Sequence, residues 1–377
     1  MAMMGGLKVS SSFIKSYLII VVLVIHQLFG FDFSDELEIA GNNRFQIQKA
    51  LNSVPENHGD GMNWLIKHMP KHDLKIVSSD FLLDNCELAY SASKKSTWGE
   101  NIPDSIFLEY VLPFGNLNEK RDNWRRDFYN RFNGVMKKAS SAYEAATILN
   151  NTIFDILGVK YSTERPKADQ SPYESIEAGL ASCTGLSILL IDACRSIGIP
   201  ARFVGTRLWY NNSGNHSWVE IWDDGWHYTG AAEPSGNDLN KVWFSGLASR
   251  AVKGHPKYGI YAATWGKKQI HFPMDWLPGL KIYNAVDVTE TYTENVNDNL
   301  IPIRIKVTNL DGQRQSTNVT VTGADNFLFE GLTNSESNDA NDHLTLMLPI
   351  GKIFSIGVNN IKQTITVTKE ELIDLKI

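Results

Sequence analysis

Three side chains in the middle of this 377-residue chain have the types and the order that thiol chemistry requires. Cys183 opens a helical pattern, His216 begins the alternating run HSWVEIW (216–222), and Glu233 precedes Pro234 after a short hairpin. Amide N–H groups at a helix N-terminus favour an anion, so a thiolate forms there below the ~8.5 of free cysteine. A neighbouring His takes the proton and a carboxylate orients the ring. The pattern therefore predicts a nucleophile, a base and an orienting acid.

The elements that hold these residues follow from periodicity. A helix is expected over residues 183–197, with an apolar face that includes the Cys and with Gly198 after its end. Residues 199–204 are typical of a strand, and the run 216–222 alternates like one. An Asp-Gly turn signal then leads to a return strand at 226–228. A helix followed by antiparallel strands predicts an α+β fold.

Two neighbours compete for roles in this group. Glu220 lies on the same strand face as His216 and is an alternative to Glu233 as the orienting carboxylate. His227, on the return strand, is a weaker alternative as the base. The choice between them depends on which side chains the fold brings together.

Further candidates would complete a catalytic site. An oxyanion hole would combine the backbone N–H of the nucleophile with Gln170 or Tyr161, which are candidates by position. Trp218, Trp222 and Trp226 would form an aromatic substrate face. The chain has no C-x₂-C pair and no H-E-x-x-H motif, so no metal and no cofactor are expected.

Three runs carry a resemblance to a known family: SCTGLSILLIDACRSIGIPARF (182–203), HSWVEIW, and GWHYTGAAEP (225–234). Together they resemble the transglutaminase-like superfamily over about residues 140–245. These enzymes share a papain-like thiol site with Cys, His and Asp in that chain order. The resemblance implies Cys183 as nucleophile and His216 as base. Where the family usually has Asp before Pro, this chain has Glu233, further from Trp226 than usual.

The chain divides into five expected segments. Residues 1–30 form a signal peptide or anchor, 31–140 a helical region, 141–265 the papain-like core, 266–284 a linker, and 285–377 a small all-β sandwich. The whole arrangement resembles exported bacterial proteins that end in a carboxypeptidase-regulatory-like sandwich. No chemistry is expected in the sandwich, which has no Cys and a single His.

The N-terminal residues indicate export. Lys8 and Lys15 precede an apolar run over 17–25, a length typical of a signal-peptide core, while 13–31 could act as a membrane anchor. The protein is therefore expected to be secreted, periplasmic or associated with the cell envelope. Cys86 and Cys194 would pair or stay buried.

The net charge of −6, without any basic block, excludes a nucleic-acid partner. The sequence predicts a thiol-dependent enzyme acting on amide bonds through an acyl-enzyme, a peptidase or amidase ahead of a cross-linking enzyme. Its substrate would be a peptide, a protein or a glycopeptide. The alternative is a non-catalytic exported protein that binds a peptide or glycan and keeps a vestigial triad.

Overall fold

The computed structural model describes residues 32–274, 276–293 and 299–377. The described residues fall into two compact units, which divide between Leu83 and Asp84. The expected signal peptide or anchor at 1–30 lies outside the described residues. Within the described ranges, no helix is both long enough and apolar enough to cross a bilayer.

The described part of the first unit is helical, as the sequence predicts. In α4, Met62, Leu65 and Ile66 are buried on one face, and the helix ends just before Pro70, which cannot continue it. The elements are α2 (Ser34–Ala40), α3 (Arg44–Ser53), α4 (Gly59–His68), α5 (Lys71–Leu74) and the first residues of α6 (Ser79–Lys95), with 3-10 turns at Gly41–Asn43 and Glu56–His58.

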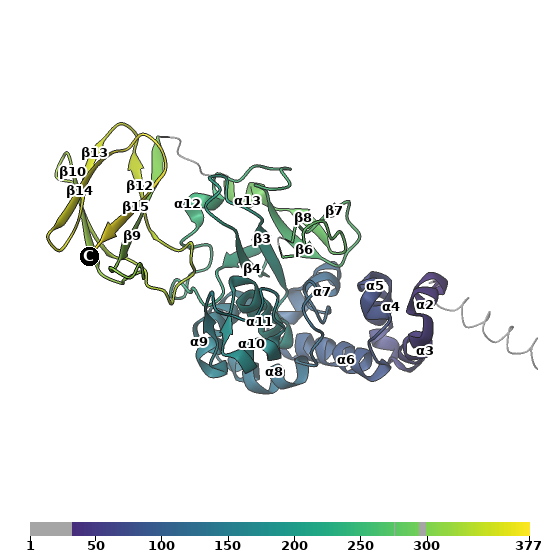
Figure 1. The fold of residues 1–377 in the computed structure, drawn as a ribbon. Helices are drawn as coiled ribbons and strands as arrows, with labels where there is room; N and C mark the ends of the chain where they lie inside the picture. The colour runs from purple at the N-terminus through teal and green to yellow at the C-terminus, as the bar shows by residue number, and fades with distance from the viewer. Residues whose placement is uncertain (1–31, 275, 294–298) are drawn as a thin grey trace, which may run out of the picture. The chain divides into compact units, whose positions relative to one another are not determined.

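In the second unit, helices surround α11 (Cys183–Ser196), whose residues from Thr184 onward are all buried. Helices α8, α9 and α10 pack against α11 on one side, and strands β3 and β4 pack against it on the other (Figure 1). The predicted Cys-bearing helix is confirmed. The other helices are α7 (Asp104–Tyr110), α8 (Arg125–Phe132), α9 (Ala142–Leu157), α10 (Pro172–Ala178), α12 (Ser245–Ala248) and α13 (Thr289–Thr293), with 3-10 turns at Gly99–Asn101 and Asn133–Lys137.

A six-stranded antiparallel sheet, in the order β5-β4-β3-β6-β8-β7, supports the core. Its strands are β3 (Ala201–Thr206), β4 (His216–Trp222), β5 (Trp226–Thr229), β6 (Ile260–Thr264), β7 (Ile270–His271) and β8 (Asn284–Asp287). Thr206 pairs with His216, so the base lies at the end of the central strand pair. A short parallel pair, β1 (Lys160–Tyr161) with β2 (Leu180–Ala181), leads into α11.

The segment 266–284, expected as a linker, contributes to this sheet. It contains β7 and the first residue of β8. Phe272, Met274 and Tyr283 are buried in the same apolar core as α11. Because these side chains cover one face of the sheet, the segment packs as part of the core despite its Pro and Gly content.

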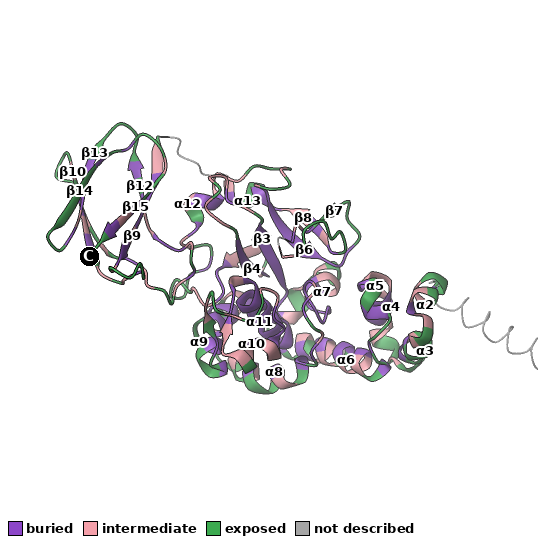
Figure 2. Ribbon diagram, viewed as in Figure 1, coloured by how far each residue is buried: buried purple, intermediate pink, exposed green. Residues whose placement is uncertain are grey.

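Strand β4 is buried on both faces, which the alternation of its sequence does not indicate (Figure 2). One face packs on α11, and the other is covered by aromatic side chains. Trp209, Trp218 and Phe244 form a buried cluster there, next to His216. Aromatic side chains therefore pack against the imidazole ring of the base.

The C-terminal strands form two facing sheets, in the orders β11-β10-β13-β14 and β12-β9-β15. Their inner side chains make a separate apolar core that includes Ile305, Val321 and Ile356. The α+β class and the strand-rich C-terminal region are thus as predicted. The strands are β9 (Leu300–Thr308), β10 (Asn318–Gly323), β11 (Leu328–Leu332), β12 (Leu344–Pro349), β13 (Ile353–Val358), β14 (Ile361–Thr366) and β15 (Glu371–Lys376).

Candidate active site

Cys183 is held at the N-terminus of α11 by its neighbours in the sequence. The Ser182 hydroxyl caps the helix by accepting from the Gly185 amide at 3.2 Å. The hydroxyls of Thr184 and Ser217 lie 3.2 Å apart and join the helix start to β4. Cys183 itself is half-buried, whereas both flanking residues are buried. The helix start and the His-bearing strand are thereby fixed next to each other.

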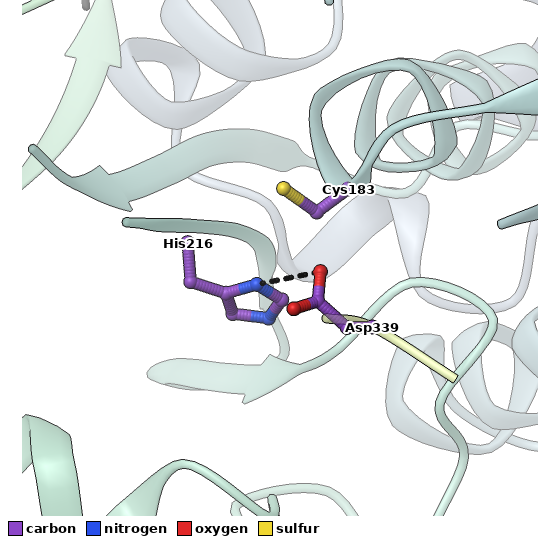
Figure 3. Close-up of side chains that lie close together, drawn as sticks. All are labelled: Cys183, His216 and Asp339. Atoms are coloured by element: carbon purple, nitrogen blue, oxygen red, sulfur yellow. Dashed lines mark ion pairs between the residues drawn. The ribbon is translucent and has the colours of Figure 1, made fainter. Parts of the chain in front are cut away.

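The His216 side chain is only 1% exposed, and carboxylates face both of its ring nitrogens. Nε2 lies 3.5 Å from Glu233 Oε2, and Nδ1 lies 3.6 Å from Asp339 Oδ2. These ion-pair distances exceed the usual hydrogen-bond range of about 2.7–3.2 Å. Cys183 Sγ, one His216 nitrogen and one Asp339 oxygen all lie within 4.8 Å of one another (Figure 3). The predicted nucleophile and base are therefore neighbours.

Two opposing effects determine the charge of His216. Burial lowers the pKa of its imidazole, but the charge of Glu233 and the contacts with Asp339 and Cys183 raise it, and the net pKa lies well above the ordinary value. The imidazolium form is favoured, and an imidazolium next to a thiol stabilises the thiolate.

Glu233 reaches His216 because of a tight turn after β5. The Glu233 amide donates to the Gly230 carbonyl at 3.2 Å, and Ala232 has a left-handed φ of 63°. A Cβ at position 230 would collide with the Glu233 carboxylate, so glycine leaves room for the side chain to fold back. Trp243 Nε1 donates to Glu233 Oε2 at 2.8 Å. The turn thus places the carboxylate of Glu233, whose side chain is longer than that of the usual Asp, beside His216.

Asp339 was not expected in the site. It lies in the connection between β11 and β12, residues 333–343, which we call the site loop. The expectation that the C-terminal sandwich contributes nothing near the chemistry is wrong, because this side chain, 2% exposed, contacts His216. No pattern in the sequence indicates this position, because a polar run between strands is usually a surface turn.

Glu220 and His227, the competing candidates, have structural partners. Glu220 is fully buried, forms an ion pair with Arg202 at 2.5 Å and accepts from the Tyr292 hydroxyl at 2.5 Å. His227 has one ring nitrogen 3.1 Å from the Asp223 carbonyl and the other 3.1 Å from the Asn240 side chain. These contacts favour Glu233 and His216 for the chemical roles.

The two oxyanion candidates differ. The Gln170 side-chain nitrogen donates to the carbonyls of Glu174 and Leu180, so the amide supports the backbone before α11 and is not directed at the thiol. The Tyr161 hydroxyl accepts from the Ala340 amide at 3.0 Å and keeps its own proton, because burial and the nearby Asp339 raise the pKa to about 12. Tyr161 remains a candidate donor near Cys183, and Gln170 does not.

The structure does not form the expected substrate face. Trp218 is fully buried, and its Nε1 donates to the Tyr292 hydroxyl at 2.8 Å. Trp222 and Trp226 are half-buried and pack edge to face on each other, with the Arg202 guanidinium 3.6 Å from the Trp226 ring centre. Trp218 lies on β4, which is buried on both faces, and Trp222 and Trp226 pack on each other, so the three do not form a common substrate face.

The two remaining cysteines lie in the interior of the fold. Cys86 and Cys194 are both buried thiols, and burial raises the pKa of each, that of Cys86 to about 12. Within the described residues, one set of Cys, His and carboxylate donors lies close enough to hold a metal ion, namely Cys183, His216 and Asp339. Two of the three, Cys183 and His216, are the candidate nucleophile and base.

Parts of this chain are similar in sequence or structure to known proteins. The sequence model of the transglutaminase-like superfamily matches residues 130–230. No curated protein matches. Among solved structures, a cysteine protease candidate from Cytophaga hutchinsonii is 20% identical over 39% of this chain and 50% of its own, with a TM-score of 0.28; the chain therefore spans about half of its length. A C-terminal fragment of the pilus adhesin SpaC from Lactobacillus rhamnosus GG is 9% identical over 45% of this chain and 74% of its own, with a TM-score of 0.16.

The family match and the geometry agree on one assignment. The matched residues contain α11, β4 and most of the hairpin that leads to Glu233. They place a thiol at a helix N-terminus next to an imidazole on a strand, which supports a thiol enzyme in general. Over residues 130–230, this chain is similar to the transglutaminase-like superfamily.

Proposed function

We propose that this protein is a thiol-dependent enzyme that acts on amide bonds through an acyl-enzyme. The observation that supports this most is the position of His216, which has Cys183 near one edge of its ring and Glu233 on Nε2. A candidate nucleophile, a base and an orienting acid are therefore neighbours in the order that a catalytic triad requires. Cys183 is the nucleophile in this proposal, His216 moves the proton, and Glu233 orients the ring.

The reaction would proceed in two steps. The Cys183 thiolate attacks the amide carbonyl, a C–S bond forms, the C–N bond breaks, and the imidazolium gives its proton to the leaving amine. Water or an amine then attacks the thioester, His216 accepts its proton, and the C–S bond breaks. The Cys183 amide and the Tyr161 hydroxyl are the proposed donors to the developing oxyanion.

Hydrolysis is proposed ahead of transfer to an amine. The same triad supports both outcomes, and access of water to the acyl-enzyme decides between them. The partial exposure of Cys183 supports access by water. We propose a peptide, a protein or a glycopeptide as the substrate and, from the N-terminal sequence pattern, export to the cell envelope or beyond.

A mass-spectrometric assay tests the reaction. The protein would be incubated with mixed peptides that contain side-chain and backbone amides, with and without an added primary amine, beside Cys183→Ala and the exposed-residue control Asp311→Ala. Cleaved or deamidated products that need Cys183 support hydrolysis, and amine adducts would instead show transfer. A protein that leaves all peptides unchanged, or that works equally well as Cys183→Ala, would contradict the proposal.

A further inference from the structure

The site loop occupies the reacting side of His216. Asp339 Oδ2 lies 3.6 Å from Nδ1, and the same carboxylate belongs to the group within 4.8 Å that includes Cys183 Sγ. In the close-up, the carboxylate and the thiol approach the same edge of the imidazole (Figure 3). A leaving amine must come within about 2.6–3.2 Å of the proton-bearing nitrogen. The carboxylate fills the space that this amine needs.

Hydrogen bonds within the C-terminal sandwich hold the site loop. The Arg314 guanidinium, 8% exposed, donates to the backbone carbonyls of Asn338, Asp339 and Asp342 at 2.8–3.1 Å. The Thr333 hydroxyl adds hydrogen bonds to the carbonyls of Gln315 and Thr317. The sandwich therefore presents Asp339 on a shaped loop.

The contacts between the loop and the core are polar and local. Besides the Asp339–His216 ion pair, the Ala340 amide donates to the Tyr161 hydroxyl at 3.0 Å, and Asn341 Nδ2 donates to the Asn215 carbonyl at 3.1 Å. Water can replace such hydrogen bonds at small net cost. The loop is thus bound to the site by interactions that a polar substrate could replace.

We propose that the site loop is a built-in inhibitor of the thiol site, with Asp339 in the leaving-group position until substrate displaces the loop. The inference rests on the proposed function, because it assigns a competitor to the same nucleophile and base. The protein then exists in a closed form, with the loop seated, and an open form that accepts substrate. The apparent substrate affinity is then the affinity of the open form multiplied by the fraction of molecules that are open.

Alkylation of Cys183 measures this equilibrium without a known substrate. Second-order rate constants would be compared for iodoacetamide and for a maleimide that carries a large fluorophore, with Cys183 labelling read by peptide mapping. At about pH 9.5 a free thiol is mostly ionised, so access limits the rate more than ionisation does. The variants are Asp339→Ala, Asn341→Ala and the control Asp311→Ala, an exposed residue of the same sandwich.

We expect Asn341→Ala to raise the rate with the bulky maleimide about fivefold, the effect of losing one net hydrogen bond. Asp339→Ala, which loses the ion pair with His216, should raise this rate by a similar factor. The rate with iodoacetamide should rise less in both variants. Asn341→Ala keeps every charge at the site, so a gain there reports release of the loop. Unchanged rates in both variants, in protein with a wild-type melting curve, would overturn the proposal. So would rates that fall, since Asp339 would then be a positioning residue.

A failure of the proposed function gives a different result. In that case His216→Ala would alkylate at the wild-type rate at neutral pH, whatever residue occupies position 339. Faster labelling of Asp339→Ala together with a dependence on His216 supports both proposals.

Discussion

Two carboxylates face the same imidazole, and they come from different parts of the fold. Glu233 belongs to the core, follows β5 by a few residues, is 18% exposed at its side chain and is held by Trp243. Asp339 belongs to the C-terminal sandwich, is almost fully buried and is presented by Arg314. Both favour the imidazolium form of His216.

Their positions give them opposite consequences. A carboxylate on Nε2 orients the ring and leaves Nδ1 to exchange a proton with the thiol or the leaving amine. A carboxylate on Nδ1 competes with both for that proton. Similar charge and similar distance therefore do not define a role; the ring nitrogen that each group faces does.

A third carboxylate, Glu220, should matter for stability alone. Glu220→Gln removes the charge that the buried Arg202 requires, and leaving such an ion without its partner costs about 3 kcal/mol. Chemical denaturation should show this loss, while the pH profile of Cys183 alkylation in the folded variant stays as in the wild type. A profile that moves would assign Glu220 a part in orienting His216.

A fourth carboxylate shows how crowded the site is with negative charge. Burial, followed by the charges of Glu233 and Asp339, raises the pKa of Asp342 to about 7. The folded state then holds a proton that the unfolded chain releases near pH 4, so this contribution to stability is present at low pH and is lost as pH rises from about 4 to about 7.

Replacing Asp342 by Asn should therefore stabilise the protein at pH 8, by on the order of 2 kcal/mol. Urea unfolding at pH 4.5 and pH 8 measures this, with Asp311→Asn as the exposed control. The gain should shrink toward zero at pH 4.5. An equal gain at both pH values would show that charge crowding is not its cause.

Removal of the core carboxylate should slow the chemistry. Glu233→Ala is expected to reduce Cys183 alkylation at pH 6.5 about tenfold, because the imidazolium loses its orienting partner. Asp238→Ala, an exposed acid on the same loop, serves as the control. Partial recovery in Glu233→Asp would show that the carboxylate itself is needed; an unaffected Glu233→Ala would remove Glu233 from the triad.

The turn that positions Glu233 offers a smaller and more local test. Gly230→Ala places a methyl group against the Glu233 carboxylate and should displace it from Nε2. We expect about a fivefold loss of alkylation rate at pH 6.5, roughly 1 kcal/mol of lost orientation. The melting temperature should change little, since the nearest atom that the methyl group meets is the far end of the flexible Glu233 side chain. A wild-type rate would mean that Glu233 acts from another position.

Local features of the site could be predicted from the sequence. The apolar period and Gly198 predicted α11, and alternation predicted β4 with the observed ends. These patterns depend on residues close together in the chain. The sequence does not show that both faces of β4 are covered. Its alternation therefore predicts an exposed Trp218, whereas the structure buries this side chain.

Asp339 could not be predicted, for a physical reason. Its loop meets the core through contacts between residues far apart in the chain: Arg314 holds the loop, and hydrogen bonds join the loop to Tyr161 and Asn215. None of these contacts leaves a periodic pattern. In the sequence, the loop resembles any polar turn between strands. Only the folded structure brings Asp339 next to His216 and Cys183.

The most direct test of the central claim is the pH dependence of iodoacetamide alkylation at Cys183, read by peptide mapping in the wild type and in His216→Ala. Our account predicts a wild-type rate that is already high well below pH ~8.5, where a free thiol reacts slowly, and a loss of this low-pH reactivity in His216→Ala. Ordinary thiol behaviour in both proteins would contradict the thiol–imidazole pair and the enzyme proposed from it.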